Sequence, residues 1–151
     1  MSLSDWQRNG WLTTHKSSAS EVRDLLGVID RELRDSAVNE ISTDARLGMA
    51  YNAVLKAGTI ALAAAGYRPS RDQAHYRVIQ SLVLTIGASP QEVGRLDAFR
   101  KKRNVSDYDR AGTTSEAEVA ELLAIVISLR QRVMEWLAAT HPALVKPDAN
   151  T

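Results

Sequence analysis

The stretch TDARLGMAYNAVLKAGTIALAAA, residues 43–65, decides the fold. Apolar residues recur in it every three or four positions, which is the spacing of one helical face. These positions are Leu47, Tyr51, Val54, Gly58, Ala61 and Leu62. The alanines between them carry little bulk, so other helices can approach closely. The stretch therefore predicts a long helix at the centre of a bundle, and Gly66 is its expected end.

Five further segments carry helical patterns. They are residues 5–16, a segment opened by Ser18, residues 71–86, a segment opened by Ser89 and Pro90, and a last one from about 113–115 to His141. Connections between them are short, which favours antiparallel neighbours. No strand pattern is evident. We expect an all-α protein, an antiparallel bundle of about five helices without a sheet, with the third and sixth segments at its centre.

Capping signals and the chain ends divide the sequence further. Ser18 with Glu21, and Ser89 with Glu92, have the spacing of helix-opening residues, and Ser4 with Gln7 has the spacing of a capping box. Gly10 weakens the first segment. We expect an N-terminal arm or short helix over residues 1–17, the bundle over 18–141 and a flexible tail over 142–151.

Composition excludes several classes of protein. The 151 residues carry a formal net charge of only +1, so any binding of nucleic acid must come from a local cluster of cations. There is no cysteine, and three scattered histidines do not have metal-ligand spacing, so we expect no metal and no cofactor. The N-terminus does not resemble a signal peptide, and residues 119–129 are too short to span a membrane. A cytoplasmic protein without a membrane partner is expected.

The fifth helical segment changes character halfway along. Its apolar face begins with Val93, Leu96 and Phe99. Steps of three or four from Leu96 then reach polar residues: Arg100, Arg103, Asn104 and Asp107. Polar groups on an inward side need partners, so this polar stripe predicts a cleft, a second subunit or a satisfied network. A solvated helix end with ordinary charges is the alternative.

Three short motifs carry a resemblance to a known family. The segment RNVSDY, residues 103–108, resembles the Arg-Asn-x-x-x-His signature of the HEPN superfamily of small helical proteins. The segment AYNA, residues 50–53, resembles the Ala-Tyr-x-Ala pattern often seen there. Residues 66–68, followed by His75 and Tyr76, are similar to the connection after that helix. The resemblance covers about residues 18–140.

This resemblance implies a bundle of four or five helices, commonly paired into a homodimer with two signatures facing one cleft. It implies that active members cut RNA without a metal. In this sequence Arg103 would then stabilise the charge on the phosphate group, and Asn104 beside it would have the orienting role. Other members bind nucleotides, or pair with a nucleotidyltransferase, without cutting anything. Tyr108, however, stands where the signature has histidine, and a phenol with a pKa near 10 is a poor base at neutral pH.

The expected function is therefore binding of RNA or a nucleotide phosphate without efficient catalysis. The alternatives are a metal-independent endoribonuclease of toxin type, and an interaction protein paired with a nucleotidyltransferase antitoxin.

The candidate catalytic residues are Arg103, Asn104 and Tyr108, and the candidate substrate-binding residues are Arg100, His75, Asp107 and Tyr51. His75 would replace the missing imidazole if its ring faced Arg103. Packing is the commoner role of such a histidine.

Overall fold

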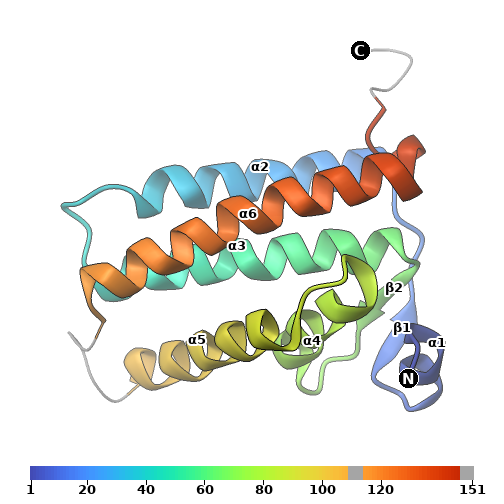
Figure 1. Cartoon of the computed structure of the whole chain (residues 1–151), viewed down its shortest axis with the longest axis horizontal. Helices are drawn as coiled ribbons and strands as arrows, with labels where there is room; N and C mark the ends of the chain where they lie inside the picture. The colour runs from blue at the N-terminus through green and yellow to red at the C-terminus, as the bar shows by residue number, and fades with distance from the viewer. Residues whose placement is uncertain (109–113, 147–151) are drawn as a thin grey trace.

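The computed structural model describes the backbone of residues 1–108 and 114–146, and the side chains of residues 1–104 and 114–146. Within these ranges the chain is an all-α bundle with one small sheet (Figure 1). In chain order the elements are α1 (Leu3–Arg8), β1 (Leu12–Thr14), α2 (Ala19–Ser36), α3 (Thr43–Ala64), β2 (Tyr67–Pro69), α4 (Ala74–Thr85), α5 (Pro90–Tyr108), α6 (Glu116–Thr140) and the 3₁₀ helix η1 (Pro142–Leu144). The prediction of a helical bundle is confirmed.

Helix α3 is the centre of the bundle. It packs against α2, α4, α5 and α6, and in Figure 1 it runs between α2 on one side and α4 and α5 on the other.

Helix α3 is apolar and long enough to cross a membrane, but 61% of its most apolar window is buried, which is typical of a core helix in a soluble protein. Helix α6 instead buries one stripe and leaves Ile127 57% exposed. The expectation that the sixth segment is also central is therefore wrong.

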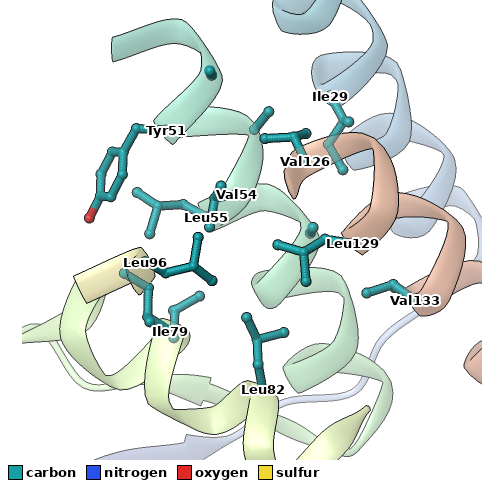
Figure 2. Packing of buried hydrophobic residues seen from close by; sticks show 14 of the residues in the cluster. Ile29, Tyr51, Val54, Leu55, Ile79, Leu82, Leu96, Val126, Leu129 and Val133 are labelled. Atoms are coloured by element: carbon teal, nitrogen blue, oxygen red, sulfur yellow. The ribbon is translucent and has the colours of Figure 1, made fainter. Parts of the chain in front are cut away.

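The core is one cluster to which α2, α3, α4, α5 and α6 all contribute. Figure 2 shows Ile29 of α2, Leu82 of α4, Leu96 of α5 and Leu129 of α6 converging on α3. The hydroxyl oxygen of Tyr51 points away from the aliphatic side chains drawn in Figure 2. The core thus contains a polar atom at this position.

Helix α4 approaches α3 at a glycine. A Cβ atom placed on Gly58 would lie 2.6 Å from Cγ1 of Val78 and 3.3 Å from its carbonyl oxygen. Any side chain at Gly58 would therefore hold the two helices further apart. The close approach fixes the position of the first turns of α4 against α3.

A buried arginine joins three helices at the opposite end of α3. Arg46 is 5% exposed, and its Nε donates a 2.7 Å hydrogen bond to the carbonyl oxygen of Ser36 at the end of α2. Its Nη1 donates to both carboxylate oxygens of Glu116, at 2.8 and 3.1 Å, in the first turn of α6. Charge-assisted bonds of this kind are the strong ones, so Arg46 fixes α2 and α6 relative to α3.

A two-stranded sheet contradicts the expectation of a chain without strands. Strands β1 and β2 pair antiparallel, with Leu12 opposite Pro69 and Thr14 opposite Tyr67. Three residues are too few to show the alternation that identifies a strand in sequence. Pro69 is tolerated because every strand of a two-stranded sheet is an edge strand.

The N-terminal segment differs from the expected helix over 5–16. Helix α1 is only six residues long, and its capping box is formed by Ser2 and Asp5 rather than Ser4 and Gln7. Gly10 follows with φ +79°, which a continuing helix cannot accommodate. Trp6 and Leu12 are buried against Leu62 of α3, so this segment is docked on the bundle.

Two other boundaries move. Helix α4 begins at Ala74 instead of 71, because Gln73 adopts a left-handed conformation with φ 55°. The flexible tail predicted over 142–151 is wrong for its first residues, since residues 142–144 form η1 and both Leu144 and Val145 pack against the core. Residues 147–151 lie outside the described part of the chain. The helix starts at Ser18, Ser89 and Ser115 are confirmed by hydrogen bonds from backbone to serine hydroxyl.

Gly58→Ala should lower the free energy of unfolding by up to about 2 kcal/mol. Overpacking by one methyl group costs roughly 1–3 kcal/mol, and alanine recovers up to about 1 kcal/mol in helix propensity. Denaturant unfolding followed by circular dichroism measures this. The control is Gly27→Ala in α2, where an added Cβ meets nothing within 4 Å and stability should rise. Equal stability of the two variants would contradict the close contact.

Candidate functional site

A polar hollow of about 550 Å³ lies between the start of α4 and the second half of α5. Its lining residues come from the turn before α4 and from these two helices: Arg71, Gln73, Ala74, His75, Tyr76, Arg100 and Asn104. Arg100 and Asn104 are four residues apart, so they lie one turn apart on the same face of α5. The polar stripe that interrupts the apolar face of α5 thus lines a hollow.

Arg103 lies next to this hollow, against α3. Its guanidinium carbon is 5.3 Å from the centre of the Tyr51 ring, and a Cβ atom placed on Gly48 would lie 3.8 Å from its Nε. The Tyr51 ring in turn meets the His75 ring edge to face, with centroids 6.0 Å apart. Tyr51 therefore connects Arg103 on α5 with His75 on α4.

Tyr51 contributes a buried hydroxyl group next to the hollow. The residue is 1% exposed, and among the described residues its Oη has no hydrogen-bonding partner. Burial raises the pKa of Tyr51 to about 12, although the charges of Arg100 and Arg103 act in the opposite direction. The phenol is therefore protonated at neutral pH. Buried hydroxyl groups without a hydrogen-bonding partner are rare. Tyr51 is not among the residues that line the hollow.

The pKa of His75 reports the electrostatic character of the site. Burial lowers the pKa below its ordinary value, and the positive charges of Arg103, Arg100 and Lys56 lower it further. The imidazole is therefore neutral at pH 7, with one nitrogen able to accept a proton. Since all the charged groups that shift this pKa are cations, the ring lies in a positive potential.

One carboxylate balances part of this charge. Arg100 Nε donates a 2.7 Å hydrogen bond to Oδ1 of Asp97, and Lys101 Nζ lies 3.4 Å from Oδ2. Burial alone would raise the pKa of Asp97, but the hydrogen bonds and positive charges of Arg100 and Lys101 together outweigh it, and the pKa is lowered. Asp97 is thus ionised and holds Arg100 in place through Nε, which leaves the terminal nitrogens of Arg100 for other contacts.

The structure brings together five of the residues predicted from the sequence. His75, Arg100 and Asn104 line the hollow, and Arg103 and Tyr51 lie beside it. Asp107 and Tyr108 belong to the last turns of α5, where side chains are outside the described part of the chain, so their predicted roles have no structural counterpart here.

Four lining residues were not named as site candidates from the sequence: Arg71, Gln73, Ala74 and Tyr76. Tyr76 entered the sequence analysis only as part of the family resemblance. Their closeness in the chain to His75 is the signal that could have found them.

A second hollow, of about 500 Å³, lies between α5 and α6 and has different chemistry. Its floor is apolar and includes Leu96 and Leu129. The cations at its rim are paired across the two helices: Arg95 with Glu121 at 2.5 and 2.6 Å, and Arg132 with Glu92 at 2.7 and 3.1 Å. These paired charges do not favour an anionic ligand, so the polar hollow is the better candidate.

The basic run at residues 100–103 is divided between different surroundings. Arg100 lines the hollow and Arg103 lies on Tyr51, whereas Lys102 Nζ is 2.9 Å from a carboxylate oxygen of Glu118 on α6. Lys101 is largely exposed. Only the two arginines of the run therefore contribute directly to the candidate site, as their spacing of three residues predicted.

Comparison with protein-family models, with curated proteins and with solved structures finds no match for the chain. The site is therefore defined by its own residues, and its chemistry is that of a neutral imidazole, a buried phenol and clustered guanidinium groups.

The free energy of unfolding should fall as the pH falls below about 6.5, because of His75. Its pKa in the folded chain lies below the unfolded value of about 6.5, so the unfolded chain takes up the proton first as pH falls. The stability that neutral His75 maintains is present above about pH 6.5 and is lost as pH falls through that value toward the folded pKa. Proton NMR titration measures the folded pKa, with His75→Gln assigning the signal. A midpoint at or above 6.5 would contradict the positive surroundings.

Proposed function

We propose that this chain binds the phosphate group of RNA or of a nucleotide in the polar hollow, without efficient turnover. One observation carries the proposal. In a protein with a net charge of only +1, Arg71, Arg100 and Arg103 gather around one hollow beside His75 and a buried phenol. A local concentration of cations of this kind attracts anions where the chain as a whole does not.

The types of side chain favour phosphate among anions. Arginine presents a planar fork of N–H donors that matches the oxygens of a phosphate group. Asp97 occupies Nε of Arg100, so its terminal nitrogens remain available, and the amide of Asn104 adds a neutral donor one turn away.

The proposal includes membership of the HEPN superfamily, which the sequence motifs resemble. In its favour are the helical bundle and the position of Arg103 and Asn104 next to a polar hollow. The replacement of the signature histidine by Tyr108 is the reason for proposing binding rather than turnover.

A metal-independent endoribonuclease is the second candidate, and His75 favours it. A neutral imidazole can accept the proton of a ribose 2′-hydroxyl, whose oxygen then attacks the adjacent phosphorus. The bond from phosphorus to the 5′-oxygen breaks, a 2′,3′-cyclic phosphate forms and the leaving oxygen takes up a proton. In this mechanism Arg100 or Arg103 stabilises the charge on the phosphate oxygens.

A homodimer and a nucleotidyltransferase partner stay predictions. The polar stripe on α5 was expected to need a second copy for its charges. Within one chain, Arg100, a member of this stripe, already pairs with Asp97. The stripe therefore gives less support to a dimer than the sequence suggested.

Arg100→Ala and Arg103→Ala should each weaken binding of labelled single-stranded RNA by roughly 10- to 100-fold, because a hydrogen bond to a charged group contributes about 1.5–3 kcal/mol. Each should also make the slope of log K against log salt concentration less steep, by the amount that the loss of about one phosphate contact gives. Fluorescence anisotropy at several salt concentrations measures both. Lys101→Ala is the matched control, since it removes one exposed cation from the same helix. Equal affinity of all four proteins would refute the phosphate site.

The same RNA distinguishes the two candidate functions. A binding protein leaves it intact in the presence of a chelator, whereas a nuclease cuts it and loses this activity in His75→Gln. Tyr108→His restores the signature and should create or raise cleavage if the hollow holds the phosphate as proposed.

A further inference from the structure

A row of alternating aromatic and cationic side chains leads to the polar hollow. The guanidinium carbon of Arg77 lies 3.7 Å from the ring centre of Trp11 and 5.4 Å from that of Tyr76. The guanidinium carbon of Arg100 lies 5.5 Å from the Tyr76 ring centre. The row starts between α1 and β1, crosses the first turn of α4 and ends on α5.

Tyr76 is the aromatic member of this row that lines the hollow. It lines the hollow together with Arg100, and it is only partly buried. Arg77 is outside the lining, and its Nε is buried without a hydrogen-bonding partner among the described residues. The stacking of Arg77 on Trp11 therefore makes it a fixed support for Tyr76.

This arrangement places a ring next to a set of phosphate-binding groups. His75 precedes Tyr76 in the chain, and Arg100 contacts both the ring and the hollow. A volume of about 550 Å³ is within the roughly 300–1,000 Å³ of ordinary small-molecule sites, so it exceeds the need of a phosphate ion alone.

We propose that the hollow takes an unpaired nucleotide, with its base stacked on Tyr76 and its phosphate between Arg100, His75 and Asn104. The inference rests on the proposed phosphate site. Every base has a π-face, so stacking on an aromatic ring binds a nucleotide with little sequence preference. Bases inside a duplex have no free face, and the site therefore selects single-stranded RNA or a free nucleotide.

Two ligands with the same phosphate group isolate the stacking. Calorimetric titration of the full chain with adenosine 5′-monophosphate and with ribose 5-phosphate, at equal ionic strength, compares a ligand that has a base with one that lacks it. Adenosine 5′-monophosphate should bind roughly 5- to 150-fold more tightly, the range that removal of a stacking ring gives. Tyr76→Leu should lower its affinity to that of ribose 5-phosphate, whose own affinity stays unchanged. Tyr76→Phe should keep the preference.

The possible failures are distinct. If wild-type protein binds both ligands equally, base stacking is refuted while the phosphate site stands, and this comparison requires no variant. If Tyr76→Leu, shown by circular dichroism to be folded, weakens both ligands equally, Tyr76 only shapes the phosphate site and the inference is overturned. If neither ligand binds wild-type protein, the proposed phosphate site fails and the inference fails with it.

Discussion

The contact between Gly58 of α3 and Val78 of α4 is the constraint on which the candidate site depends. Val78 follows His75 by three residues, and Gly58 follows Tyr51 by seven, so each pair lies on one helical face. Because no side chain separates the two helices at Gly58, the His75 ring comes to 6.0 Å from the Tyr51 ring. A wider spacing would open the hollow between α4 and α5.

Helix α5 supplies the charge because its buried face ends before the helix does. Leu96 and Phe99 are buried and anchor the first half of α5, and Arg100 and Arg103 follow on the continuation of that face. The change from apolar to polar lies close to Tyr51, a large core side chain of α3 whose buried hydroxyl group has no hydrogen-bonding partner among the described residues. Core and site are thus adjacent parts of one packing arrangement.

The sequence determines the long helices through periodicity and capping, and these features were predictable. The serine caps, the apolar stripe of α3 and the polar stripe that includes Arg100 and Arg103 are all patterns within a single helix. Each can therefore be recognised from the local sequence. Strands β1 and β2 were not predictable, because their pairing depends on Trp6 and Leu12 docking against Leu62. Tyr76 was not predicted as a site residue, because periodicity identifies a helical face but not where the core beneath it stops.

Arginine side-chain NMR tests the phosphate site most directly. In a titration of ¹⁵N-labelled protein with ribose 5-phosphate, the Nε–Hε signals of Arg100 and Arg103 should shift and saturate together. Arg95 and Arg130 are bound to Glu121 and Asp30 and serve as references that should not move. Shifts of equal size at all four arginines, or none at Arg100 and Arg103, would contradict a phosphate site in the hollow.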